Sequence, residues 1–169
     1  GVPDLTGDNR GEVLIGAPLE DTGRAYLYSG ASGAFLRAMI SPNEETASGQ
    51  FGYSVAGLPD TNGDGRGDIL VGTNSEDPSG SPDNAGRAHY FDGLTGFLLQ
   101  SIVSPRDEQD GFFGFSVAGV PDATGDGRGD LLIGAYGEDP DASPNQAGRV
   151  YLYSTQQSAA FATDAWRVY

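Results

Sequence analysis

One segment that occurs three times along the chain constrains its fold more than any other feature. The copies are GVPDLTGDNRGEVLIGAP from Gly1, GLPDTNGDGRGDILVGTN from Gly57 and GVPDATGDGRGDLLIGAY from Gly119. Each is followed by a second similar run, GRAYLYSG from Gly23, GRAHYFDG from Gly86 and GRVYLYST from Gly148. Repetition of this kind is typical of architectures in which each copy forms one unit and neighbouring units bury a shared core.

Each full period contains four short runs that predict β-strands. Runs such as Glu12 to Ile15 and Ala25 to Tyr28 are rich in Val, Ile, Leu and Tyr, are bounded by turn residues, and are too short for helices. The other two kinds of run are FGYSVAG from Phe51 with FGFSVAG from Phe113, and AFLRAMISP from Ala34 with GFLLQSIVSP from Gly96. Four strands in about 60 residues are the content of a propeller blade.

We therefore expect an all-β fold, a β-propeller segment of three four-stranded blades at about residues 1–50, 51–112 and 113–169, together one unit over 1–169. The first copy lacks the FG-x-S-V-A run, and the tail after Ser154 matches the fourth strand only loosely. Propeller rings have four to eight blades, so the open edges must be met by further sequence or by another chain. The chain is either a piece of a longer propeller or a subunit of a homo-oligomer that closes the ring, such as a six-bladed dimer.

The composition argues against several classes of function. The formal net charge is −15 and all nine basic residues are dispersed arginines, whereas nucleic-acid binding requires clustered cations. There is no cysteine, so disulfides and thiolate metal sites cannot form. No stretch approaches 18 apolar residues, so we expect no membrane span. The acidic residues form either a solvated surface or ligands for a hard cation such as calcium.

Oxygen-bearing side chains alternate along the turn that joins the first two strands of each period. This spacing lets a tight loop place its oxygens around one ion, in the calcium-loop order of positions 1, 3, 5, 7 (a backbone carbonyl) and 9. The expected ligands are Asp4, Thr6, Asp8, the Arg10 carbonyl and Glu12; Asp60, Asn62, Asp64, the Arg66 carbonyl and Asp68; and Asp122, Thr124, Asp126, the Arg128 carbonyl and Asp130. We therefore expect calcium as the cofactor, with up to three ions.

These loops differ from the helix-loop-helix calcium hand at position 12. Ile15, Val71 and Ile133 stand where that motif has a bidentate glutamate, so position 9 must supply the closing carboxylate. Asp, Asn and Gly also form turns without metal, but a turn alone does not need three anions placed together in three copies. The first loop is the weakest match, because Asn9 replaces a glycine and Glu12 is longer than Asp.

The combination of FG-[YF]-S-V-A-G-x-P-D, G-D-G-R-G-D-[IL]-L-[VI]-G and Gly16-Ala17-Pro18 resembles the FG-GAP repeat of the integrin α-subunit propeller, over residues 1 to about 154. The resemblance implies a seven-bladed propeller in which several of these loops hold calcium. The later copies depart from it, with Gly72-Thr73-Asn74 and Gly134-Ala135-Tyr136 in place of GAP. Similar repeats occur in secreted bacterial proteins, in a fungal lectin and beside the catalytic domain of a secreted phospholipase.

Four other patterns have structural interpretations. Arg66-Gly67-Asp68 and Arg128-Gly129-Asp130 spell a tripeptide that integrins recognise, but both aspartates are expected to be calcium ligands. His89, the only histidine, is expected to pack rather than to catalyse. The arginines of the Gly-Arg pairs, Arg24, Arg87 and Arg149, are expected to pair with carboxylates between blades. An acidic face opposite the calcium turns is expected from the loops at Glu76 and Glu138 and the connectors at Glu44-Glu45 and Asp107-Glu108, either for a partner or as solvated surface.

The expected function is a calcium-binding, non-catalytic, extracellular or cell-surface module that acts as a binding or adhesion scaffold for a protein or carbohydrate ligand. Extracellular calcium modules bind with dissociation constants on the order of 10⁻⁴ to 10⁻³ M, which suits calcium levels outside cells. The alternative is an accessory propeller domain of a secreted hydrolase such as a phospholipase. A catalytic domain in the parent chain would favour that alternative.

Overall fold

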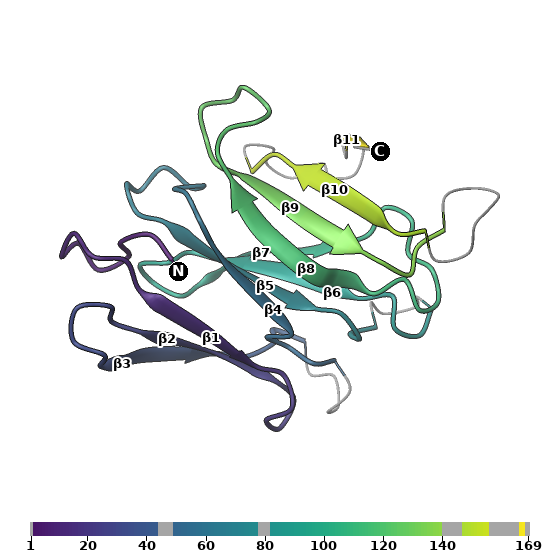
Figure 1. Ribbon diagram of the computed structural model, residues 1–169, viewed down its shortest axis with the longest axis horizontal. Helices are drawn as coiled ribbons and strands as arrows, with labels where there is room; N and C mark the ends of the chain where they lie inside the picture. The colour runs from purple at the N-terminus through teal and green to yellow at the C-terminus, as the bar shows by residue number, and fades with distance from the viewer. Residues whose placement is uncertain (1, 44–48, 78–81, 140–146, 156–165, 168–169) are drawn as a thin grey trace.

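The computed structural model describes residues 2–43, 49–77, 82–139, 147–155 and 166–167, which form three antiparallel sheets (Figure 1). The first sheet consists of β1 (Val13–Ala17), β2 (Arg24–Tyr28) and β3 (Phe35–Met39). The second consists of β4 (Ser54–Leu58), β5 (Asp68–Thr73), β6 (Arg87–Phe91) and β7 (Leu98–Val103). The third consists of β8 (Phe113–Val120), β9 (Asp130–Ala135), β10 (Arg149–Tyr153) and β11 (Trp166–Arg167).

Each strand pairs with the next strand of the chain, so every sheet is an up-and-down meander. The strands coincide with the runs found in the sequence, which confirms the expected all-β architecture of a partial propeller. The first sheet has three strands, and in place of an opening strand the described residues form a single bridge between Val2 and Glu12. The described residues contain no helix, and hence none with the length and apolarity that crossing a membrane requires.

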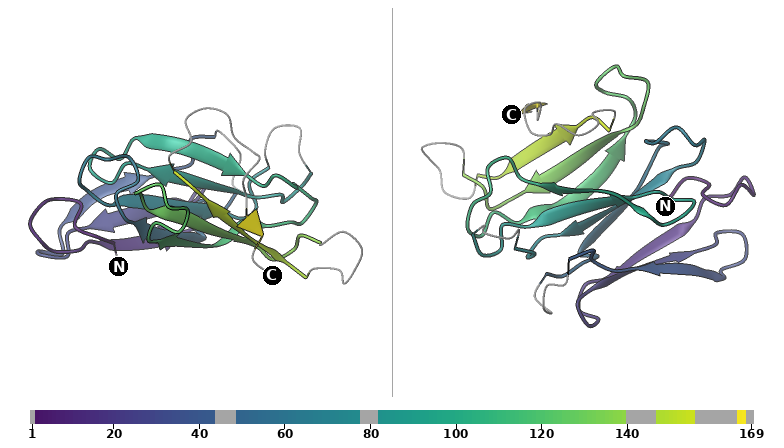
Figure 2. Two further views of the ribbon diagram at one scale, coloured as in Figure 1. Left: turned by 90° about the horizontal axis from the view of Figure 1, so that it is seen from above. Right: turned by 180° about the vertical axis from the view of Figure 1, so that it is seen from behind.

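Adjacent sheets lie face to face (Figures 1 and 2). Alternate residues of their strands form the buried contacts between them. One buried cluster joins the first and second sheets and includes Ala25, Leu27, Met39, Ile69, Val71 and Phe91. The other joins the second and third sheets and includes Leu70, Ala88, Tyr90, Leu131, Ile133 and Tyr151. The second sheet is therefore buried on both faces, and each large apolar side chain buried there stabilises the fold by about 1.5–3 kcal/mol.

The Phe-Gly pair that opens the second and third copies attaches each sheet to the one before it. Phe51 and Phe113 are fully buried, and they form parallel bridges to Gly23 and Gly86. The backbone of this pair lies directly on the previous sheet, because a Cβ atom at Gly16 would be 1.9 Å from the Gly52 carbonyl oxygen. Glycine is therefore required at Gly16 by the close approach of two backbones.

The turns between the first two strands of each period project from one end of the three sheets (Figure 1). We call them the first loop (residues 4–12), the second loop (residues 60–68) and the third loop (residues 122–130). The connection from β1 to β2 lies at the opposite end (Figure 1). The fold thus gathers the three expected calcium turns on one side of the molecule.

Candidate calcium sites

The first carboxylate of each loop organises the backbone that follows it. This carboxylate accepts the N–H of the residue three positions later at 2.6 Å and of the residue five positions later at 2.7–2.8 Å. The donors are Gly7 and Asn9 for Asp4, Gly63 and Gly65 for Asp60, and Gly125 and Gly127 for Asp122. The three loops therefore share one hydrogen-bonded turn.

This turn requires left-handed backbone at its fourth and sixth positions. The glycines there have φ values between 83° and 89° in the three loops. Asn9 takes the sixth position of the first loop with a φ of 64°. Asn is one of the few residues that tolerate this region, so its presence does not disturb the loop.

The ninth position places a carboxylate at the base of each loop, where the second strand begins. Glu12, Asp68 and Asp130 are all buried, with exposed fractions of 2%, 0% and 0%. Each accepts the N–H of the second residue of its own loop, from Leu5, Thr61 and Ala123 respectively, at 2.7–2.8 Å. The aspartate at position 5 of each loop accepts a hydrogen bond from the backbone N–H of the arginine at position 7. The peptide of this arginine is therefore held in the same way in all three loops.

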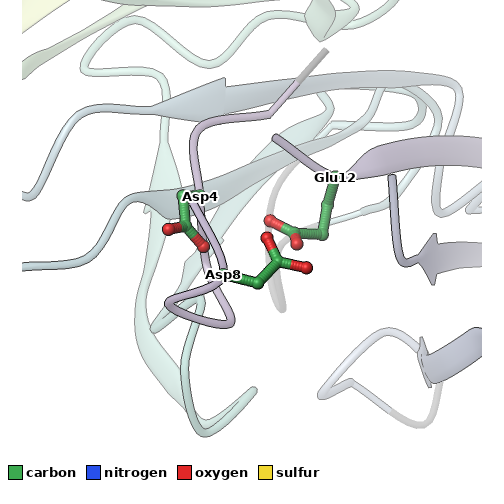
Figure 3. Close-up of side chains that lie close together, drawn as sticks. All are labelled: Asp4, Asp8 and Glu12. Atoms are coloured by element: carbon green, nitrogen blue, oxygen red, sulfur yellow. The ribbon is translucent and has the colours of Figure 1, made fainter. Parts of the chain in front are cut away.

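The first loop brings three carboxylates together (Figure 3). One oxygen from each of Asp4, Asp8 and Glu12 lies within 4.8 Å of the others, and no other group of three His or acidic side chains in the described residues is as close. Three negative charges at this separation repel one another unless a cation neutralises them. The loop with the weakest sequence match therefore has the tightest acidic cluster, because the longer Glu12 side chain lies beside Asp8 (Figure 3).

The charge state of these carboxylates suits a cation. Burial would raise the pKa of Asp4, but the N–H groups of Gly7, Asn9 and Thr6 and the Arg66 guanidinium outweigh it and lower the pKa. Burial raises the pKa of Asp68 despite hydrogen bonds from Thr61 and Gly93. A cation beside Asp68 would therefore stabilise its ionised form. All expected ligands are oxygens, the donor type that Ca²⁺ prefers, and the residues present therefore fit this ion.

The two Arg-Gly-Asp tripeptides do not present their aspartates to solvent. Asp68 and Asp130 are fully buried and are hydrogen-bonded within their own loops. A receptor that reads this tripeptide needs an accessible carboxylate. The folded chain therefore offers neither copy to such a receptor.

A buried polar network around Glu76 was not predicted from the sequence, which placed Glu76 on an acidic face, either for a partner or as solvated surface. Glu76 is 1% exposed and accepts hydrogen bonds from Ser41 Oγ (2.6 Å), Asn43 Nδ2 (2.8 Å) and Thr73 Oγ1 (2.9 Å). Its Oε2 atom also lies 2.7 Å from His89 Nε2. Burial alone would raise the pKa of Glu76, but these partners outweigh it and hold the pKa at about 2.

This network joins two sheets, because Ser41 and Asn43 follow β3 of the first sheet whereas Glu76 and His89 belong to the second. His89 Nδ1 also lies 2.8 Å from Ser101 Oγ, so a Ser-His-Glu chain is present. His89 is fully buried, and Tyr26 and Tyr151 occupy its position in the other sheets and contact Glu20 and Glu138 in the same way. The repeated feature is thus a carboxylate with a ring donor, which is a structural contact.

Two expectations about the acidic end of the molecule were wrong. Glu138 is fully buried like Glu76, so neither residue forms part of an exposed acidic face, whether for a partner or for solvent. Arg24 and Arg149 pair with Glu20 and Glu138, which lie in the turns of their own sheets, and not with carboxylates of a neighbouring sheet. The connector at Glu44-Glu45 lies outside the described residues. A glutamate recurs four residues after the Gly of each GAP-like triplet, at Glu20, Glu76 and Glu138. This recurrence was the sequence signal for the contact between the glutamate and the ring of the third strand.

Comparison with known families assigns the repeats. Residues 51–91 and 113–153 match the family model of the FG-GAP repeat. These ranges begin at the buried phenylalanines and end with the third strands of the second and third sheets. The chain therefore contains FG-GAP repeats over these two ranges.

The particular repeats are similar to those of integrin alpha subunits. The chain is 34% identical over 173 residues to integrin alpha-IIb of Mus musculus, in a match that covers 92% of this chain and 15% of that subunit. It is 33% identical over 154 residues to integrin alpha-IIb of Homo sapiens, covering 80% of this chain and 14% of the subunit. It is 34% identical over 155 residues to integrin alpha-8 of Mus musculus, covering 81% and 14%. No catalytic family is indicated by these matches.

Proposed function

We propose that this chain is a calcium-binding, non-catalytic propeller module that acts as an extracellular adhesion or binding scaffold. The observation that carries the proposal is the hydrogen-bonded turn shared by the three loops, with Asp4, Asp8 and Glu12 within 4.8 Å of one another. Calcium would bind through the side chains at positions 1, 3, 5 and 9 and the carbonyl of the arginine at position 7. The ion would neutralise the carboxylates and fix the start of the second strand of each sheet.

Calcium is expected to raise the melting temperature of the chain relative to a chelator. At a calcium concentration ten times the dissociation constant, each occupied loop contributes about 1.4 kcal/mol, because the ligand binds only the folded state. Differential scanning calorimetry and isothermal titration calorimetry would measure the stabilisation and the number of ions. Asp8→Asn is expected to remove one ion, whereas Asp83→Asn, which removes an exposed charge outside the loops, leaves the number unchanged. No calcium-dependent shift would contradict the proposal.

The similarity to integrin alpha subunits supports an adhesion scaffold, and weak calcium affinity would suit an extracellular location. The chain spans about 15% of the length of these subunits, so its protein or glycan partner is part of the proposal. Loops at the end opposite the calcium loops would contact the partner, since loops on a rigid scaffold carry most binding residues. No feature of the described residues favours the accessory-domain alternative.

Two open sheet faces support self-association as part of this proposal. Val13 and Ile15 of β1 are each 48% exposed, whereas Ile69 and Val71, at the same positions of β5, are fully buried between sheets. At the other end Val150 of β10 is 40% exposed, although its equivalents Ala25 and Ala88 are fully buried. A second copy stacked head to tail would place one open face on the other and repeat the contact that already joins the sheets.

The chain is expected to form dimers or larger oligomers in calcium. Light scattering after size-exclusion chromatography would give a mass at least twice the 17.5 kDa of one chain. Ile15→Lys changes only an exposed position of the open face and is expected to reduce this mass to that of one chain. A wild-type monomer at high concentration would contradict self-association and leave the calcium proposal untouched.

A further inference from the structure

The three loops are not independent of one another, because the residue before the first loop packs on the second loop and the residue before the second loop packs on the third. Pro3, next to the first loop, lies against Gly67 of the second, where a Cβ atom would be 2.7 Å from Pro3 Cβ. Pro59 lies against Gly129 of the third loop with the same 2.7 Å separation. Gly67 and Gly129 are buried, whereas Gly11, at the same position of the first loop, is exposed.

The arginine at position 7 extends this contact toward the metal-binding side chains. The Arg66 guanidinium reaches from the second loop to the first, where Nη1 lies 3.8 Å from Asp4 Oδ2. It also covers Gly7, at which a Cβ atom would lie 2.2 Å from Arg66 Nη2. Arg128 of the third loop likewise donates from Nη1 to the carbonyl oxygen of Thr61 in the second loop at 2.8 Å.

These arginines are held in place by their own loops. The backbone N–H of Arg66 is bonded to Asp64 Oδ1 at 2.7 Å, and that of Arg128 to Asp126 Oδ1 at 2.9 Å. Both side chains are half-buried, whereas Arg10, at the same position of the first loop, is exposed because the described residues include no sheet before it. Arg66 and Arg128 each have their backbone in one loop and their guanidinium group against the preceding loop.

We infer that Arg66 and Arg128 couple calcium binding between adjacent loops, an inference that rests on the proposed function. Calcium in the second loop fixes the Arg66 peptide and so the guanidinium that orders Asp4 and Gly7 of the first loop. Calcium in the third loop acts on the second in the same way through Arg128. The first loop is therefore preorganised by the occupancy of the second, and reciprocity requires that the first loop also favour binding in the second.

A double-mutant cycle read by NMR tests the coupling one loop at a time. The backbone amide signals of Gly7 and Gly63 report on calcium binding in the first and second loops. Asp64→Asn weakens the second loop but keeps an oxygen for the Arg66 N–H. It is expected to shift the calcium midpoint of the Gly7 signal about fivefold higher in the wild-type background. In the Arg66→Ala background the same substitution is expected to leave the Gly7 midpoint unchanged.

Arg10→Ala is the matched control, because it removes the same side chain from the same loop position without an inter-sheet contact in the described residues. The Asp64→Asn effect on Gly7 should persist in it. If Arg66→Ala does not fold, Arg128→Ala with Asp126→Asn gives the same cycle read at Gly63. The inference is overturned if Asp64→Asn does not change the calcium midpoint of the Gly7 signal in the wild-type background. It is also overturned if Asp64→Asn shifts this midpoint equally in the Arg66→Ala background. If no loop signal of the wild-type chain responds to calcium, the proposed function is overturned as well. This outcome can be told apart from the other two, because in both of those the Gly7 signal still responds to calcium.

Discussion

Replacing Glu76 with glutamine is expected to lower the free energy of unfolding by about 3 kcal/mol at pH 7, with a melting temperature lower by about 10 °C. The carboxylate is buried, has its pKa held at about 2, and accepts hydrogen bonds from both the first and the second sheet. Glutamine has nearly the same shape but carries no charge, and its amide nitrogen cannot accept a hydrogen bond as the second carboxylate oxygen does. Urea denaturation of both proteins in chelator would measure the difference without a contribution from calcium.

Glu20→Gln provides the matched control for this experiment. Glu20 holds the same position in the first sheet, but its side chain is 50% exposed. Its loss is expected to cost less than about 0.5 kcal/mol, the usual range for surface substitutions. Equal losses in the two variants would contradict the role given to the buried network.

The contribution of Glu76 should also depend on pH. A carboxyl whose pKa is lowered on folding stabilises the native state fully above its unfolded pKa, near 4.5, and this contribution disappears as the pH falls toward about 2. The stability difference between wild type and Glu76→Gln is therefore expected to be constant above about pH 5.5 and to shrink below pH 4.5. A difference that stays constant down to pH 2.5 would show that Glu76 does not act through its charge.

Gly72→Ala is expected to destabilise the chain by about 3 kcal/mol, because the second and third sheets cannot remain in contact around an added methyl group. A Cβ atom at Gly72 would lie 2.0 Å from the carbonyl oxygen of Gly114, which is a backbone atom and cannot rotate away. The chain must therefore separate two sheets that share the cluster of Leu70, Ala88 and Ile133. Chemical denaturation would measure the loss.

Gly33→Ala separates this clash from the general cost of losing a glycine. Gly33 has a φ of 71° and no atom within 4 Å of an added Cβ, so only backbone strain of about 1 kcal/mol is expected. Gly72 is not in the left-handed region, so its cost comes from packing alone. If Gly72→Ala costs no more than Gly33→Ala, the close approach of the sheets is contradicted.

The strands and the loops were predictable because both depend on residues close together in the sequence. Asp60 organises its loop through amides at Gly63 and Gly65, and the pattern of carboxylates and glycines specifies that turn by itself. Even the positive φ of Asn9 follows from the sequence, because the other two copies have glycine there.

The buried carboxylates and the position of Arg66 were not predictable in the same way. Both depend on how closely two sheets approach, and this distance is determined by contacts such as Gly16 with Gly52 between separate copies. An acidic residue in a loop of Asp, Ser and Pro has the composition of a solvated surface, and Glu76 is an exception because Ser41, Asn43 and His89 surround it. Such partners lie up to 35 residues away from it in the sequence.

The loops at the two ends of the sheets differ in how much their length varies between copies. At one end the loops have a constant spacing from first to ninth position, because the hydrogen-bonded turn tolerates neither insertion nor deletion. At the other end the connection from β1 to β2 runs over 18–23, whereas the equivalent connections from β5 to β6 and from β9 to β10 run over 74–86 and 136–148. New sequence can therefore be added at this end without disturbing the hydrogen-bonded turns at the other end. The architecture separates a rim of constant loops, which we propose to bind calcium, from a variable rim on which new binding specificity can be engineered or can evolve.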